Sequence, residues 1–499
     1  MRLSAATRTA IVVFSLLPLF RLTHQSLWYD ELFTLFVARH TVARVLDQAA
    51  WDGFTPPLYY LLIALAQRAG LAAESLRVVS VGFGALALWG LGRLATRLSG
   101  ARAGFAAVLL AGISPFLVSM SQELRPYTAF LACAACAADA FLEWRRAPSL
   151  RRGLAWAAWL LGATAFSYLG LALVPLALVG ALVTPAGRRP AAALALVAFA
   201  AAALISLPGL RKARGLYQNR SERGRVRWET RPILPFARIV LGGGLRPEPI
   251  GDERDRRLAA IAEWTVRAAL GLALIAAVLR RDRTLLTCAA TLVTALAGVW
   301  TADAMLGIGV TTRYLSLALL PFLLLVVRMA SAVPWVGAPA AILLAVLQLL
   351  ALQRYLLEPA YARDDWRALS ARLLRLHQPG DLILGFPGHH AAVAFSAYAP
   401  ELPLIGGFTG RRGEQVYLFR EGEHFRGYDF GDQLEEVGAD LGAALRRRGE
   451  GRRVRIVSYA DEDWHGNVGQ VVEALGARVA RSERFPARET LLIRELAPW

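Results

Sequence analysis

Charged residues are scarce in this chain. Asp, Glu, Lys and Arg make up 19% of its 499 residues, whereas 56% are hydrophobic and the mean hydropathy is +0.42. Typical soluble domains contain about 25% charged residues. The deficit, together with long uncharged stretches, excludes an ordinary soluble protein and predicts a multi-pass membrane protein.

Cysteine is also rare, and Cys133, Cys136 and Cys288 all lie within apolar segments. The first two form a C-x-x-C pattern in the stretch LACAACAADAF. Redox chemistry needs an accessible, acidified thiol, so helix packing is the better interpretation. The pair His389-His390 has no carboxylate or cysteine at ligand spacing, and no metal ligands are predicted there.

Lysine is nearly absent, since Lys212 is the only one, and arginine therefore supplies the net charge of +18. The arginines do not form a long basic stripe; they cluster in short runs between apolar segments. That placement is typical of a membrane-topology signal. We therefore expect no nucleic-acid partner.

Apolar stretches long enough to cross a bilayer, which takes about 17–25 residues, recur along the chain. The uncharged stretch from Gly153 to Gly187 is too long for one helix, so we divide it into two spans with a turn near Ser167–Gly170. No small-x-small cleavage site follows the first apolar run, which is expected to remain as a span. The eleven predicted spans cover about residues 9–27, 76–92, 104–120, 126–142, 153–168, 170–186, 191–209, 258–279, 284–302, 314–330 and 333–352.

The short apolar run Leu58–Gln67 decides the predicted topology. At 1.5 Å per residue it covers roughly half of a hydrocarbon core. If it lies at the interface and the N-terminus is cytoplasmic, every short arginine-rich connection falls on the cytoplasmic side, as the positive-inside rule requires. The first outer loop (about 28–75), the second (about 210–257) and the tail then lie outside. Arginines of the second loop are expected to attract anionic membrane lipids.

The tail, residues 353–499, differs from the predicted membrane domain, residues 1–352. Charges are dense there, and Arg363–Leu376 has the pattern of an amphipathic helix. The segments after Gly380, VRIVSY and ETLLIREL predict strands, and NVGQVVEALGA predicts a helix. This alternation predicts a small extracytoplasmic α/β domain.

Two adjacent carboxylates, Asp30 and Glu31, follow the first span in the stretch SLWYDELF. Acidic residues in a first helical turn favour the helix dipole, so they are consistent with a simple helix start. A carboxylate among Trp28, Tyr29 and Phe33 at a membrane interface is also a candidate general base. The spacing alone does not separate these two interpretations.

Two Arg-Tyr combinations are expected on the same outer face. One lies in the segment Gln122–Tyr127, where Arg125 precedes Pro126 and Tyr127, and the other is Arg313-Tyr314. Arginine and tyrosine serve as interfacial anchors in many membrane proteins. A fixed arginine can also hold a phosphate with two hydrogen bonds.

Together these motifs resemble those of the C-type membrane glycosyltransferases, specifically glycosyltransferase family 39 and its bacterial relatives, which include protein O-mannosyltransferases and aminoarabinose transferases. The resemblance covers about residues 1–352, and the tail resembles small outer domains of some bacterial members. It lies in the ordered stretches SLWYDELF, TPPLYYLL, SPFLVSMSQELRPY and, more weakly, TTRYLSLALLPFLLL. Many relatives have His before the two prolines, where this chain has Thr55.

The resemblance implies a polyprenyl-phosphate sugar donor, bound from the inner membrane, and a lipid, glycan or protein acceptor arriving from outside. Asp30 would be the catalytic base, Glu31 would assist it, and the sugar would be transferred with inversion. Arg125 and Arg313 would stabilise the charge that grows on the phosphate, and Tyr127 and Tyr314 would position it. No cofactor is implied beyond the option of a divalent cation. Further substrate-binding candidates are Tyr59, Tyr60, Gln122 and Glu123.

Two other classes of protein fit parts of the sequence. A transporter or flippase for a lipid-linked glycan should show charged or broken helices near mid-membrane and internal repeats. Asp139, inside the fourth predicted span, is such a charge, but no clear repeat is present. A non-catalytic glycan- or lipid-binding relative is the third option, and the intact Asp30 argues against it.

Overall fold

A computed structural model provides the structure of the chain, in which contacts separate two compact units. The membrane unit comprises Met1–Leu22 and His40–Leu357, and the tail unit comprises Thr23–Arg39 and Glu358–Trp499. The described residues are 2–52, 55–173, 253–306, 312–386, 388–402, 404–407, 417–419, 434–436, 452–459, 467–485 and 490–497, with scattered positions at 193–241 and 443. The predicted spans 170–186 and 191–209 and most of the predicted loop 210–257 lie outside them.

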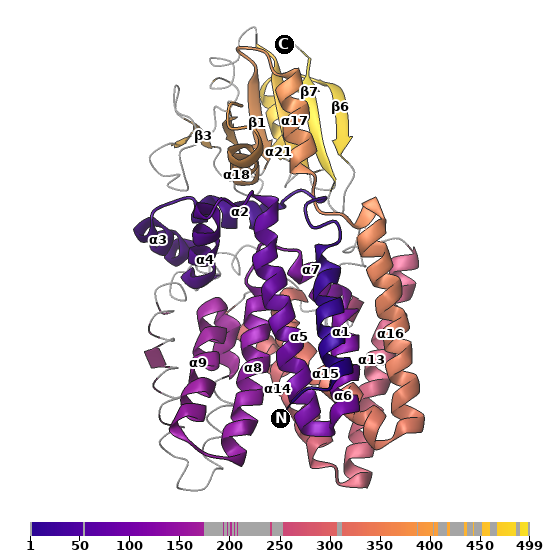
Figure 1. The fold of residues 1–499 in the computed structure, drawn as a ribbon. Coiled ribbons are helices and arrows are strands. Elements are labelled where there is room, and N and C mark those ends of the chain that lie inside the picture. Colours follow the sequence, from indigo (N-terminus) through magenta and orange to yellow (C-terminus); the bar gives the residue numbers. More distant parts are fainter. Residues whose placement is uncertain are drawn as a thin grey trace. The chain divides into compact units, whose positions relative to one another are not determined.

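The described part of the membrane unit is helical (Figure 1). Its α-helices are α1 (Ala5–Leu16), α3 (Val42–Asp52), α4 (Pro57–Arg68), α5 (Val78–Ser99), α6 (Ala101–Gly112), α7 (Pro115–Ser121), α8 (Tyr127–Arg146), α9 (Leu150–Phe166), α13 (Glu253–Arg280), α14 (Arg283–Leu306), α15 (Ser316–Ala332) and α16 (Pro334–Leu357). Short 3-10 helices cover Leu17–Leu19, Glu74–Arg77, Tyr168–Ala172 and Thr312–Leu315.

Five of these helical segments are long and apolar enough to cross a membrane, or six if α6 and α7 form one broken span. They coincide with the predicted spans at 76–92, 258–279, 284–302, 314–330 and 333–352, and the pair α6–α7 with 104–120. Helices also occur at 126–142 and 153–168, where α8 carries charges in its second half and α9 has 17 residues. Helix α9 ends where the turn near Ser167–Gly170 was predicted, since Ser167 is extended and a 3-10 helix follows it.

Two boundaries differ from the predictions. The first span was expected to reach residue 27, but its helical part ends at Leu19, because Phe20 is extended and Arg21 has a left-handed φ of 57°. The predicted span 104–120 bends by 64° between α6 and α7. Pro115 opens the new helix there, and the Ser114 side chain accepts a hydrogen bond from the Leu117 N–H at 3.4 Å. At the other end of the membrane unit, α16 continues to Leu357, past the predicted boundary at 352.

Small residues allow α5, α8 and α9 to pack closely. A Cβ atom added to Gly90 of α5 would lie 3.0 Å from Sγ of Cys136, and one added to Gly162 of α9 would lie 3.0 Å from Sγ of Cys133. Both cysteines are buried, and neither forms a disulfide. Each thiol therefore fills the space above a glycine of a neighbouring helix, which confirms the packing interpretation of the C-x-x-C pattern.

The described residues of the tail unit form a mixed seven-stranded sheet. The strands are β1 (Leu382–Phe386), β2 (Leu404–Gly407), β3 (Tyr417–Phe419), β4 (Leu434–Glu436), β5 (Val454–Tyr459), β6 (Val479–Phe485) and β7 (Leu491–Leu496), in the order β4-β3-β2-β1-β5-β7-β6. Strand β1 is parallel to β2 and β5, and the other pairs are antiparallel. The predicted strands at VRIVSY and ETLLIREL are β5 and β7.

Helices of the tail unit cover both faces of this sheet. Helix α21 (Asn467–Ala474) packs its Val471 against Leu384 and Ile456 on one face. Because side chains alternate along a strand, Tyr459 and Ser458 point to opposite faces. Tyr459 meets the ring of Trp366, which begins α17 (Trp366–Leu376), at 6.1 Å in an edge-on arrangement. Helix α18 (Gly388–Tyr398) follows β1 and packs against β1, β2 and α17.

Candidate functional site

The two carboxylates of SLWYDELF, Asp30 and Glu31, have different structural roles. They begin helix α2 (Tyr29–Ala38), whose N-cap residue is Trp28. Glu31 is fully buried, and its Oε2 accepts a hydrogen bond from the Trp28 N–H at 3.3 Å, so its carboxylate caps the helix. Asp30 is half-buried, and its backbone carbonyl accepts a hydrogen bond from Thr34 Oγ1 at 2.9 Å. Asp30 is therefore the more accessible carboxylate of the pair.

The segment that carries Asp30 packs with residues from the far end of the sequence. The Leu27 N–H donates to Tyr398 Oη at 2.8 Å, and the Arg367 N–H donates to Ser26 Oγ at 3.1 Å. At the other end of α2, Arg39 donates to the carbonyl of Ser396 at 2.9 Å. Contacts thus place residues 23–39 in the tail unit. The loop at about 28–75 was predicted from apolar length and the positive-inside rule, and neither gave a signal for this association.

Further contacts hold residues 24–29, which lead into α2. The guanidinium of Arg367 donates to the carbonyl of His24 at 2.6 Å. The guanidinium carbon of Arg363 lies 4.8 Å from the ring centroid of Trp28, a cation–π distance. The ring of Tyr29 stacks on His390 with centroids 3.6 Å apart and an angle of 17°. The start of α2 is therefore held by α17, α18 and the loop before α17.

Within the membrane unit, the second and third motifs meet. The Arg125 guanidinium donates to Thr55 Oγ1 at 3.3 Å, which joins the residue before the two prolines to the Gln-Glu-x-Arg-Pro-Tyr stretch. Ser80 of α5 links the same stretches, because its Oγ lies 2.7 Å from Tyr59 Oη and donates to the carbonyl of Arg125 at 3.4 Å. All four residues are buried. The structure thus brings together Thr55, Tyr59 and Arg125 around the start of α5.

The other residues of the third motif surround Arg125 in sequence. Gln122 uses both hydrogens of its amide nitrogen on the carbonyls of Pro18 and Phe20, each at 2.8 Å, so it fixes the end of the first helix. Glu123 is 1% exposed. The guanidinium carbon of Arg125 lies 6.0 Å from the ring centroid of Tyr127. The motif therefore combines a structural amide with a buried carboxylate and a buried guanidinium.

The remaining candidates lie on separate elements. Tyr60 is fully buried within α4, one residue after Tyr59. Arg313 and Tyr314 are half-buried in the 3-10 helix that opens α15. Among the described residues, no group of three or more His, Cys, Asp and Glu side chains is arranged to hold a metal ion.

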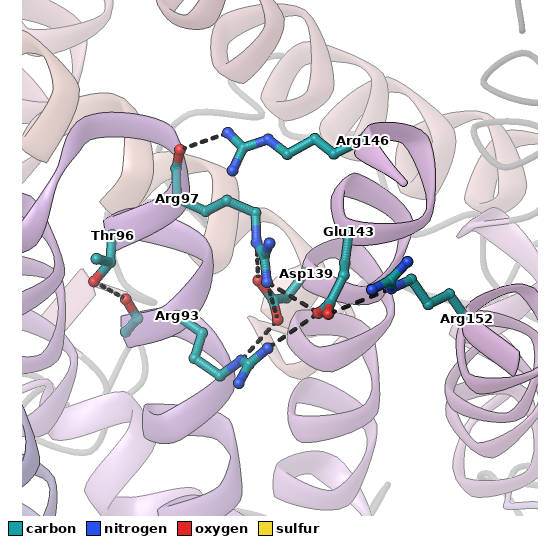
Figure 2. Close-up of polar contacts among 8 residues, drawn as sticks. Arg93, Thr96, Arg97, Asp139, Glu143, Arg146 and Arg152 are labelled. Atoms are coloured by element: carbon teal, nitrogen blue, oxygen red, sulfur yellow. Dashed lines mark hydrogen bonds and ion pairs between the residues drawn. The ribbon is translucent and has the colours of Figure 1, made fainter. Parts of the chain in front are cut away.

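A second polar cluster joins α5, α8 and α9 (Figure 2). Asp139 accepts from Arg93 Nε at 2.8 Å and from Arg97 Nε at 2.6 Å. Glu143, one helical turn further, accepts from the same two guanidinium groups at 3.2 and 3.1 Å. Arg152 of α9 lies 3.7 Å from Glu143. Asp139 is thus a paired residue of a cluster that joins these helices.

This cluster and the Arg125 stretch lie at opposite ends of α8. The helix begins at Tyr127 and has 20 residues, so it spans about 30 Å, close to the thickness of a hydrocarbon core. The arginine-rich connections α5–α6, α8–α9 and α13–α14 all lie at the end of the membrane unit where α8 finishes (Figure 1). This common location is what the positive-inside rule predicts for one face of a membrane protein.

The chain was compared with known proteins. No protein-family model matches it, and no curated protein is similar to it in sequence. A crystal structure of ArnT from Cupriavidus metallidurans bound to undecaprenyl phosphate is 14% identical, with a TM-score of 0.50 over 98% of this chain and 97% of that chain. The same protein in the apo state is 14% identical with a TM-score of 0.44, over 99% and 98% of the two chains. The likeness to the first of these structures extends through both units, and this chain therefore has an ArnT-like, C-type glycosyltransferase fold with a small C-terminal sheet domain.

Proposed function

We propose that this chain is a membrane glycosyltransferase that moves a sugar from a polyprenyl-phosphate donor to an acceptor. The observation that carries the proposal is the buried guanidinium of Arg125, which donates a hydrogen bond to Thr55. The fold of the chain is also similar to that of a protein crystallised with undecaprenyl phosphate. A buried, oriented guanidinium is suited to a phosphate group, to which it can donate two parallel hydrogen bonds.

In the proposed reaction, Asp30 takes a proton from the acceptor nucleophile as that nucleophile attacks the anomeric carbon of the donor sugar. The bond between this carbon and the phosphate oxygen breaks, and the electron pair stays on the polyprenyl phosphate. Attack from the side opposite the leaving group inverts the anomeric centre. Asp30 suits this role better than Glu31, since the Glu31 carboxylate already caps α2.

Arginine side chains would stabilise the negative charge that grows on the leaving phosphate. Arg125 is our first candidate, and Arg313 is our second. Tyr59, Tyr60, Glu123, Tyr127 and Tyr314 would shape and position the donor. The buried position of Arg125 strengthens its effect, because a charge acts over a longer range where water is excluded.

We place the reaction on the non-cytoplasmic face of the inner membrane. The supporting observation is that the arginine-rich connections lie at the end of α8 remote from Arg125. The acceptor would then be a lipid, glycan or protein of the cell envelope.

The proposal is tested with the purified full chain and undecaprenyl phosphate as the probe. Arg125→Ala should weaken undecaprenyl phosphate binding by tenfold or more, since a hydrogen bond to a charged group contributes about 1.5–3 kcal/mol. Arg102→Ala, which removes an exposed arginine of α6, serves as the matched control and should bind as the wild type does. Equal binding by the Arg125 and Arg102 variants would contradict the phosphate assignment.

The transfer step is tested in cells that lack this chain. Mass spectrometry of envelope lipids, glycans and proteins identifies the molecule whose sugar is lost, and the wild-type chain should restore it. Asp30→Asn should bind undecaprenyl phosphate normally and restore none of the product. Restoration by this variant would refute Asp30 as the base.

A further inference from the structure

We infer that the tail unit positions the proposed catalytic helix through a chain of side chains, Asp364–Tyr459–His390, that ends on the ring of Tyr29. Tyr29 is the first residue of α2 and directly precedes Asp30. This inference rests on the proposed function, and it assigns Tyr29, His390 and Tyr459 as positioning residues for that reaction.

The chain of contacts is continuous and comes from four separate elements. Tyr459, the last residue of β5, donates its hydroxyl to Asp364 Oδ2 at 3.2 Å. His390 of α18 has its Nδ1 atom 3.0 Å from the same hydroxyl oxygen. The imidazole of His390 lies flat on the ring of Tyr29, and His389 meets that ring edge-on at 5.3 Å. Asp364 and Tyr459 are buried.

The hydrogen-bond directions follow from the number of protons. Tyr459 has one hydroxyl hydrogen, and an ionised carboxylate accepts only. The hydroxyl hydrogen therefore goes to Asp364, and the Tyr459 oxygen accepts from His390 Nδ1–H. Burial and the neighbouring His389 lower the pKa of His390 well below its usual value, so the imidazole is neutral and carries its proton on Nδ1. Asp364 thus fixes the tautomer and the ring plane on which Tyr29 stacks.

The C-terminal end of helix α18 also contacts the residues that flank α2. Its Tyr398 hydroxyl accepts from the Leu27 N–H, and its Ser396 carbonyl accepts from Arg39, the C-cap of α2. These two contacts hold the helix termini, whereas the Tyr29 stack sets the rotation of the first turn. Since Asp30 lies in that turn, rotation of α2 about its axis would change the direction of the Asp30 carboxylate.

The experiment compares Tyr459→Phe, which breaks the chain of contacts, with a control variant in the same unit. Tyr459→Phe removes the oxygen that links His390 to Asp364. Arg372→Gln removes an ion pair with Glu483 of 3.0 Å between α17 and β6, and it tests for general loosening of the tail unit. Asp30→Asn serves as the chemistry control.

Three quantities are measured on the full chain: amide hydrogen exchange of residues 26–38, undecaprenyl phosphate binding, and product restored in cells. For Tyr459→Phe we expect exchange about fivefold faster, as the loss of one ordinary hydrogen bond predicts. Product should fall on the order of tenfold or more, since a displacement of about 1 Å can cost up to a hundredfold. Undecaprenyl phosphate binding should stay unchanged, and Arg372→Gln should resemble the wild type.

Unchanged exchange or unchanged product in Tyr459→Phe would overturn the inference. So would an equal effect of Arg372→Gln, because the change would then reflect general destabilisation. Full product with Asp30→Asn refutes the proposed function instead, and the exchange data still decide whether the tail unit positions α2.

Discussion

Removal of the Asp139 carboxylate should strongly destabilise the membrane unit. The side chain is 6% exposed and lies between Arg93 and Arg97, whose side chains are 23% and 5% exposed. Among the described residues, Asp139→Asn would leave only Glu143 to neutralise the two guanidinium groups, one of which is buried. Loss of one partner from a buried ion pair costs about 3–5 kcal/mol.

The neighbouring Glu143 provides the matched comparison. It contacts the same two arginines, but its side chain is 37% exposed. Solvent screening limits such a pair to about 0–1 kcal/mol, so Glu143→Gln should have a small effect. The two variants remove the same kind of charge one helical turn apart, and they differ chiefly in burial.

The assay is thermal unfolding of the purified full chain in one detergent. A loss of 3–5 kcal/mol corresponds to a decrease in Tm on the order of 10 °C, against about 2 °C for Glu143→Gln. The double variant Asp139→Leu/Arg97→Met should recover most of the loss, since it removes both buried charges together. Equal shifts for Asp139→Asn and Glu143→Gln would refute the argument from burial.

Three further outcomes are expected. The tail unit should lose stability as the pH falls below about 6.5, because the folded-state pKa of His390 is lowered and the unfolded chain therefore binds a proton that the folded chain does not. His390→Phe should flatten the dependence of Tm on pH. Gly90→Ala should lower Tm, because its Cβ would lie 3.0 Å from Cys136 Sγ, whereas Gly82→Ala on the same helix meets no atom within 4 Å and should leave Tm nearly unchanged. Thr55→Val removes the oxygen that accepts from Arg125 and should weaken undecaprenyl phosphate binding by about tenfold in an equilibrium binding assay.

The sequence predicted features that depend on local pattern. Apolar length located the helices at 258–279, 284–302 and 333–352, because the backbone of a membrane span must satisfy its hydrogen bonds internally. Strand β5 was readable because VRIVSY is rich in β-branched and aromatic residues and is fully buried.

Features that depend on distant contacts could not be predicted in the same way. Strand β6 was missed because VARSERF is charged and largely exposed, as is usual for an edge strand. The different roles of Asp30 and Glu31 required the side-chain geometry, since both fit a first helical turn. The contact between Thr55 and Arg125 joins residues 70 positions apart, and no local pattern indicates such a pair.

The tail unit is built from two segments that lie far apart in the sequence, and this has a consequence for the biogenesis of the protein. Thr23–Arg39 is synthesised directly after the first helix, but the rest of its unit begins only at Glu358. At about 5–20 residues per second, the roughly 320 intervening residues take about 15–60 s to translate. During that time helix α18, which contacts Leu27, Tyr29 and Arg39, is not yet synthesised, while the helices of the membrane unit insert. The tail unit therefore closes last, and α2 reaches its final environment only when the whole chain has left the ribosome.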